Sequence, residues 1–100
     1  MKLMTKEIEK KIPNMTYESN SDSRVYAKYF HPMSSWTWYA LEYDPETKLM
    51  YGWVDGDVPE YGSFSLQELE EVKIMGMGIE RDKYWDDTKT IGQVIEEKSN

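Results

Sequence analysis

The pattern of hydrophobic and polar positions predicts a short helix near the start of the chain, followed by a polar loop. Within residues 6–12 the isoleucines can share one side of a helix while the lysines point elsewhere. Thr5 is a suitable cap for the first turn, and Pro13 cannot continue the helix because its ring removes the amide hydrogen. Residues 14–23 are rich in Ser and Asn, which is typical of a connecting loop.

Four β-strands are predicted in the middle of the chain from runs of β-branched and aromatic residues. They cover residues 24–30, 36–43, 49–54 and 61–64, with breaks or turns at 31–34, 44–48 and 55–59. Simple alternation along the second strand places Trp36, Trp38, Ala40 and Glu42 on one face and Thr37, Tyr39, Leu41 and Tyr43 on the other. Both faces are largely apolar, so we expect this strand to be central and covered on both sides.

Two further helices are predicted after the strands from their N-terminal capping signals. Ser65 and Glu68 form a capping-box pattern at the start of a helix over residues 66–72. Thr90 and Gln93 repeat the pattern at the start of a last helix near the end of the chain. Each helix carries aliphatic residues at helical spacing, so each is expected to bury one face.

The segment between these two helices is expected to be irregular. Gly76 and Gly78 predict a flexible connection, and residues 79–82 are expected to be extended or to form a turn. The order of a helix, a run of strands and then helices predicts an antiparallel sheet of about four strands, arranged as a meander, with short helices packed on it. The fold class is therefore α+β, in a single domain over residues 1–100, because a chain of 100 residues leaves no room for two.

The distribution of charge narrows the class of partner. Residues 1–30 carry six Lys or Arg against four Asp or Glu, whereas residues 31–100 carry six against fifteen. The net charge of −7 is therefore the sum of +2 in the first part and −9 in the second. Direct nucleic-acid binding is not expected, because it usually needs a basic patch. An acidic body does permit binding to a basic protein surface, or imitation of nucleic acid.

Signals for export, membrane insertion and disulfide formation are absent from the sequence. The first residues are charged and contain no apolar export segment, and no apolar run has the length of a membrane span. The chain has no cysteine, which excludes disulfides and thiolate metal ligands. We therefore expect a cytoplasmic protein that does not associate with membranes.

No motif for a catalytic, metal or nucleotide site stands out. An Asp-Gly-Asp stretch at 55–57 suggests a calcium loop, but the Gly and Glu required at its sixth and twelfth positions are replaced by Glu60 and Leu66. His31 is the only histidine, and we interpret it as a turn residue at a strand end, with a general base as the alternative. No cofactor and no metal are predicted.

Two groups of side chains have both a structural and a functional interpretation. Glu80, Arg81 and Asp82 place a guanidinium between two carboxylates, which either fix a turn through ion pairs or leave Arg81 to recognise an anion. The aromatic residues of the strands either fill the core, because aliphatic residues are scarce, or leave an exposed subset as a binding patch. These aromatic residues are Tyr26, Tyr29, Trp36, Trp38, Tyr39, Tyr43, Tyr51 and Trp53.

Several segments, spread over most of the chain, form a recognisable set. They are LMTKE at 3–7 with KIP at 11–13, WTWY at 36–39 with EYD at 42–44, GWV at 52–54 with Gly56, EYGSFSL at 60–66 with ELE at 68–70, and IERD at 79–82. In these segments the chain resembles an uncharacterised family of small bacterial, plasmid and phage proteins, the domain of unknown function family DUF2958. The chain departs from the family pattern at residues 75–78, where a proline is common in the family and MGMG stands here. The resemblance implies a shared fold and a link to mobile elements, and it implies no activity, cofactor or functional residue.

The leading hypothesis from these observations is a non-enzymatic protein-interaction module that presents an acidic, partly aromatic surface to a protein partner. One alternative is a small enzyme or ligand-binding domain, which requires a pocket where carboxylates, an arginine and aromatic walls converge. A second alternative is an accessory protein in mobile-element or phage DNA metabolism. The candidate binding residues are Trp36, Trp38, Glu42, Glu80, Arg81 and Asp82. No catalytic residue is predicted.

Overall fold

Local capping chemistry determines where the helices begin. The Thr5 hydroxyl accepts a hydrogen bond from the Ile8 amide, and the Ser65 hydroxyl accepts one from the Glu68 amide. At the last helix the capping box is reciprocal, because the Gln93 amide donates to the Thr90 hydroxyl while the Gln93 side chain accepts from the Thr90 amide. The three predicted helices are therefore confirmed with their predicted starting points.

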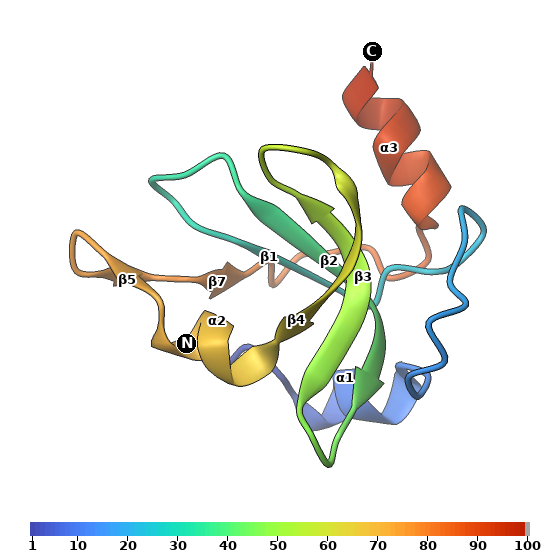
Figure 1. The fold of residues 1–100 in the computed structure, drawn as a ribbon, viewed down its shortest axis with the longest axis horizontal. Helices are drawn as coiled ribbons and strands as arrows, with labels where there is room; N and C mark the ends of the chain where they lie inside the picture. Colours follow the sequence, from blue (N-terminus) through green and yellow to red (C-terminus); the bar gives the residue numbers. More distant parts are fainter. Residues whose placement is uncertain (100) are drawn as a thin grey trace.

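The computed structural model describes residues 1–99, and in it a twisted antiparallel sheet lies between short helices (Figure 1). The helices are α1 (Lys6–Lys11), α2 (Leu66–Glu71) and α3 (Ile91–Ser99). The strands are β1 (Ala27–Phe30), β2 (Thr37–Asp44), β3 (Leu49–Asp55), β4 (Glu60–Ser65), β5 (Lys73–Ile74), β6 (Met77–Gly78) and β7 (Glu80–Arg81). The α+β class is confirmed.

The main sheet has five strands in the order β4-β3-β2-β1-β7. The predicted meander from β1 to β4 is present, and β2 is central and buried along most of its length, as expected. The fifth strand, β7, comes from the segment that was expected to be extended or to form a turn. It joins the sheet by pairing with β1, Arg81 with Tyr29 and Glu80 with Phe30. The predicted count of about four strands is thus extended by one short edge strand.

The connection around Gly76 is a small hairpin, where the sequence predicted only a flexible connection. β5 and β6 pair with each other, and Met75 and Gly76 at the tip both have positive φ, 55° and 79°. Positive φ at both central residues is the requirement of the turn that best fits a two-residue hairpin, and glycine adopts it without a steric penalty. The turn geometry at Met75 could not be inferred from a residue type that rarely adopts it.

A β-bulge at Leu41 changes which face the end of β2 presents. Ala40 pairs with Gly52 and Glu42 with Tyr51, so Leu41 is an extra residue without a partner. The shift moves Tyr43 to the face that carries Ala40, and it moves Glu42 away from that face. The prediction from simple alternation is therefore wrong for these last two residues, because a one-residue shift reverses every later side chain.

The sheet carries a hydrophobic core on each of its two faces. The first core lies beneath α1 and α2 and contains Leu3, Met4, Ile12, Ala27, Tyr29, Ala40, Tyr43, Met50, Leu66, Leu69 and Ile79. The second core lies beneath α3 and contains Val25, Tyr39, Leu41, Ile91 and Val94, with Trp53, Tyr61, Trp85 and Ile95 packed against it. Covering both faces explains why β2 is apolar on both sides.

The start of the last helix is fixed to residues 23–25, which precede β1, by backbone hydrogen bonds. The Val25 amide donates to the Lys89 carbonyl, and the Ile91 amide donates to the Ser23 carbonyl. Between them Arg24 and Thr90 form an isolated β-bridge. The chain entering β1 is thus paired with the chain entering α3, which places Val25 and Ile91 in the same core.

Candidate functional site

Glu42, one of the predicted binding residues, holds a loop in place. Its carboxylate is 3% exposed and accepts hydrogen bonds from the backbone amides of Thr16 at 2.6 Å, Tyr17 at 2.8 Å and Ser19 at 3.1 Å, and from the Ser19 hydroxyl. Burial acts to raise the pKa of Glu42, but these hydrogen bonds outweigh it and hold the pKa below its ordinary value. All four of these hydrogen bonds come from the 16–19 segment, so Glu42 organises the loop.

Trp36 and Trp38 lie together at the beginning of β2. Their rings are 5.9 Å apart between centroids, and Trp36 retains 37% of its surface while Trp38 is half-buried against the first core. A Cβ atom at Gly56 would lie 2.6 Å from the Trp36 ring, so this glycine makes room for the indole. The pair therefore joins the β3–β4 turn to the sheet and leaves part of one ring exposed.

Glu80, Arg81 and Asp82 lie on and just after β7, at the edge of the sheet opposite β4. The ion-pair cluster suggested by their order in the sequence is not formed among residues 1–99. The Arg81 Nε donates instead to the Lys2 carbonyl at 3.2 Å. Arg81 and Asp82 contribute to a cavity of about 130 Å³ that neither Trp36 nor Glu42 reaches.

The six predicted binding residues therefore occupy three separate places in the fold. Arg81 and Asp82 share one cavity, with Glu80 beside them on β7 but outside that cavity. Glu42 lines a different cavity beneath the 14–23 loop, and the two tryptophans line neither. The converging pocket required by the enzyme or ligand-binding alternative is not assembled from these side chains.

His31 is a structural residue of the β1–β2 connection, in agreement with its interpretation as a turn residue. The ring is 2% exposed, and its Nδ1 accepts a hydrogen bond from the Met33 amide at 3.0 Å. Because Nδ1 is the acceptor, the proton lies on Nε2, which donates to the Met77 carbonyl at 2.9 Å. His31 thereby joins the β1–β2 loop to the β5–β6 hairpin.

A more continuous surface lies along β4 and the helix that follows it. Residues 55–72 contain six Asp or Glu and no Lys or Arg. Of the six carboxylates only that of Asp55 forms an ion pair within residues 1–99, with Lys98. The exposed and unpaired carboxylates are Asp57, Glu60, Glu68, Glu70 and Glu71. We call this surface, β4 and α2 with these five carboxylates, the acidic edge.

A row of aromatic rings, which we call the aromatic row, adjoins the acidic edge on the face of the sheet that carries α3. Tyr17 meets Tyr51 edge-on at 5.3 Å, Tyr51 stacks on Tyr61 at 6.3 Å, and Trp53 meets Tyr61 edge-on at 4.9 Å. Tyr17 is 58% exposed and the other three rings are half-buried. The row therefore combines fixed geometry with accessible ring surface, a combination that is common at protein-binding surfaces.

Sequence reasoning identified only part of this surface. Tyr51 and Trp53 belonged to the aromatic set considered for a binding patch, but Tyr17 and Tyr61 did not. The acidic edge could have been found from the sequence, because residues 55–72 contain no Lys or Arg. The packing of Tyr17 on Tyr51 had no such signal, because it depends on Glu42 drawing the loop over the sheet.

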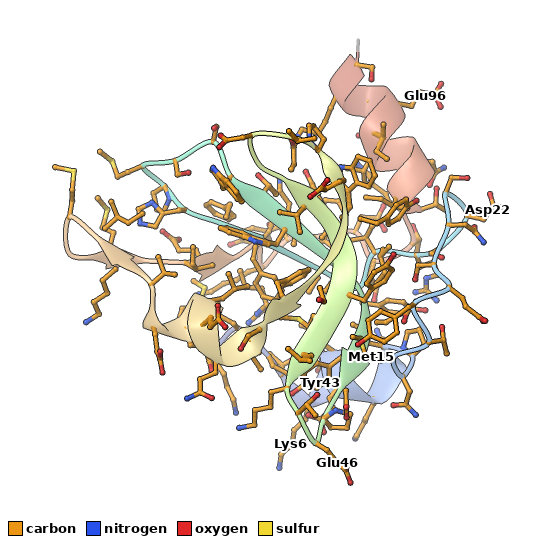
Figure 2. The ribbon with its side chains drawn as sticks, viewed as in Figure 1. Lys6, Met15, Asp22, Tyr43, Glu46 and Glu96 are labelled. Atoms are coloured by element: carbon orange, nitrogen blue, oxygen red, sulfur yellow. The ribbon has the colours of Figure 1, made fainter. Side chains whose placement is uncertain are left out.

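The positive charges lie mainly on other parts of the molecule, where acidic groups neutralise several of them. Asp87 pairs with both Lys11 and Arg24, and Glu97 pairs with Lys89. The neighbouring carboxylate of Glu96, also on α3, points away from the sheet (Figure 2). Lys28 and Lys89 also lie over the Trp85 ring, at 5.8 and 5.6 Å. The acidic edge takes no part in these pairs, and within it Glu70 lines a cavity that also contains Lys2, Lys6 and Lys48.

The described residues form neither a metal-binding group nor a membrane-spanning helix. Across residues 1–99 no group of three or more His, Asp or Glu residues is arranged to hold a metal ion. None of the helices in that range combines the length and apolar character needed to cross a bilayer.

Comparison with known proteins gives a family assignment. A family model described as "Protein of unknown function (DUF2958)" matches residues 2–99, in agreement with the resemblance noted from the sequence. Neither the curated proteins nor the solved structures contain a match to the chain. Because the family model covers nearly every residue, the chain belongs to the DUF2958 family of proteins of unknown function.

Proposed function

We propose that this protein is a non-enzymatic interaction module that binds a basic protein surface through the acidic edge and the adjoining aromatic row. The observation that carries the proposal is the group of five exposed carboxylates with no cationic partner in residues 1–99, beside accessible aromatic rings. Unpaired charges of one sign repel each other, and a surface of opposite charge relieves that repulsion on binding.

The aromatic row supports the same class of partner. Tyr51, Tyr61 and Trp53 are held by one another and by the strands that carry them, so little side-chain freedom is lost on binding. Lys and Arg side chains are attracted to the faces of such rings. A basic protein surface can therefore use both the carboxylates and the rings, whereas a nucleic-acid backbone is repelled by the carboxylates.

The enzyme alternative is less well supported by the geometry. Its charged candidates Glu42, Arg81 and Asp82 line two separate cavities, and the Glu42 carboxylate is occupied by internal donors. An accessory role in mobile-element or phage DNA metabolism is compatible with the proposal as a choice of partner. No residue on the acidic edge favours a partner from DNA metabolism over other basic proteins.

The proposal predicts that neutralising the acidic edge abolishes partner capture. We expect the variant Glu60→Gln/Glu68→Gln/Glu71→Gln to lose a partner that the wild-type protein retains from a lysate of its source cells. The measurement is affinity capture with quantitative mass spectrometry at two salt concentrations, because a charge-dependent complex weakens as salt is raised. The variant must first be shown to unfold at the same temperature as the wild type.

A matched variant controls for net charge. Asp22→Asn/Glu46→Gln/Glu96→Gln removes the same number of charges at exposed positions away from β4 and α2, all three of which are labelled in Figure 2. This variant is expected to retain the partner. Equal loss from both variants, or retention by both, would contradict an interaction through the acidic edge.

A further inference from the structure

We infer that β4 binds its partner by accepting an extended, Lys- or Arg-bearing segment as an additional strand of the sheet. The inference rests on the proposed function and adds a binding mode and a partner chemistry to it. The starting point is that β4 is the terminal strand of the five-stranded sheet, with β3 on one side only (Figure 1). A terminal strand presents a row of backbone donors and acceptors that a second chain can use.

The register determines which backbone groups of β4 face outward. The Leu66 amide donates to the Lys48 carbonyl, and this pair is in register with Phe64–Met50, Gly62–Gly52 and Glu60–Val54. In an antiparallel pair only alternate residues exchange hydrogen bonds with the partner strand. The even-numbered residues of β4 therefore bond to β3, and the backbone groups of Tyr61 and Ser63 point away from it.

These outward groups have no protein partner within residues 1–99. No backbone or side-chain hydrogen bond joins the amide or carbonyl of Tyr61 or Ser63 to another residue outside the β3–β4 ladder. The features that usually block an edge are also missing, because β4 contains no proline, no lysine and no bulge. A Cβ atom at Gly62 would meet nothing within 4 Å, so the face of the sheet at the middle of β4 is uncovered.

The opposite edge of the sheet does not offer the same opportunity. β7 has only two residues, and its Arg81 already contacts the N-terminal segment through the Lys2 carbonyl and Met1. β4 has six residues, enough for a partner strand of about 20 Å. Strand addition is therefore assigned to β4 alone.

The carboxylates define the chemistry of the added segment. Glu60 is the first residue of β4 and Asp57 lies in the turn before it, while Glu68 and Glu71 follow its end, so both ends of the strand are acidic. A complementary segment carries Lys or Arg towards both of its ends and small or apolar residues between them. A second copy of this chain fits poorly, because two β4 strands would bring like charges together.

The test uses a defined peptide that carries Lys or Arg at both of its ends and Val and Ala between them. With uniformly ¹⁵N-labelled protein, we expect the peptide to shift the amide signals of Tyr61 and Ser63 more than those of Gly62 and Phe64. The control peptide has the same side chains and N-methyl groups on alternate backbone nitrogens, which removes its ladder hydrogen bonds. We expect the control peptide to bind at least about tenfold more weakly.

Variants of β4 test the same point from the protein side. Ser63→Pro removes an outward-facing donor and leaves the β3–β4 hydrogen bonds intact, so it is expected to fold and to bind the peptide about three- to tenfold more weakly. Ser63→Ala keeps the amide and is expected to bind like the wild type. If Ser63→Pro does not fold, the difference in affinity between the unmethylated and the N-methylated peptide tests strand addition by itself.

The outcomes separate this inference from the proposed function. Equal binding of the methylated and unmethylated peptides, lost in the Glu60→Gln/Glu68→Gln/Glu71→Gln variant, would overturn strand addition and leave the acidic interaction standing. Absence of peptide binding by the wild type would overturn strand addition as well. Dimerisation of the free protein that Ser63→Pro abolishes would replace the basic segment with a second copy of the chain.

Discussion

At the scale of single residues, Glu42 shows how a buried carboxylate can be structural in a protein whose other acidic groups lie mainly at the surface. Three backbone amides of the 16–19 segment converge on it, and no cation is needed to stabilise it. The lowered pKa means that the folded state prefers the ionised form. Its contribution to stability is therefore present above the unfolded-state pKa and is lost as pH falls through the lower, folded-state pKa.

We predict that Glu42→Gln lowers the free energy of unfolding by about 2 kcal/mol near neutral pH, because an amide cannot accept from all of these donors. The difference from the wild type should narrow as pH falls below the ordinary value of 4.5. Urea denaturation over a series of pH values measures both effects. Glu46→Gln, at an exposed turn position, is the control and should change stability little.

At this scale the sequence was a better guide to which residues are important than to the role of each residue in the fold. Glu42 was proposed as one of the carboxylates of a binding pocket, but its hydrogen bonds all go to the 16–19 segment. Its role depends on the bulge at Leu41, which turns the side chain away from the first core and towards the loop. A local shift of one residue cannot be read from alternation when both faces of a strand are apolar.

At the scale of secondary-structure elements, the β2–β3 pair is constrained by the same bulge. Opposite it stands Gly52, where a Cβ atom would lie 1.8 Å from the Tyr39 carbonyl oxygen. No side chain fits at that distance without moving one of the two strands. Gly52 is therefore required by close backbone approach, and it lies within the segment at 52–54 that carries the family resemblance.

We predict that Gly52→Ala costs at least about 3 kcal/mol of stability or prevents folding, because the two strands must separate to admit the methyl group. Gly62→Ala provides a matched control one strand away, since an added Cβ there meets nothing within 4 Å. Thermal unfolding followed by circular dichroism compares the two variants. Similar losses from both would contradict the described pairing of β2 with β3.

The elements that the sequence predicted are those with strong local signals. The capping residues Thr5, Ser65 and Thr90 mark three helices, and the turn at 44–48 marks the central hairpin. The missed elements are β7 and the β5–β6 hairpin, each strand of which has two residues. Strands of that length have no periodicity, and their formation depends on a partner strand that lies elsewhere in the chain.

At the scale of the whole molecule, two cores share one sheet. Met50 is fully buried in the first core and Ile91 is fully buried in the second, and β2 contributes side chains to both. Loss of either core would expose one face of the central strand. The two faces should therefore unfold together in one cooperative transition.

We predict that Met50→Ala and Ile91→Ala each lower the stability by about 2–5 kcal/mol and shift the same single transition. Val58→Ala, at a side chain that is 67% exposed, should change it by less than about 0.5 kcal/mol. Near-ultraviolet and far-ultraviolet circular dichroism follow packing and backbone structure separately. Two resolved transitions in either core variant would contradict the coupling of the cores.

The pairing of the chain before β1 with the chain before α3 has a consequence for how the protein forms during synthesis. Arg24 bonds to the Asp87 carbonyl across 63 residues, and Trp85 bonds to the Val25 carbonyl across 60. The β2–β3–β4 meander needs only neighbouring residues and can pair while the rest of the chain is still being translated. The second core must wait for the last helix to leave the ribosome. Until then the growing chain exposes Val25, Tyr39 and Leu41, which gives chaperones their longest opportunity to bind.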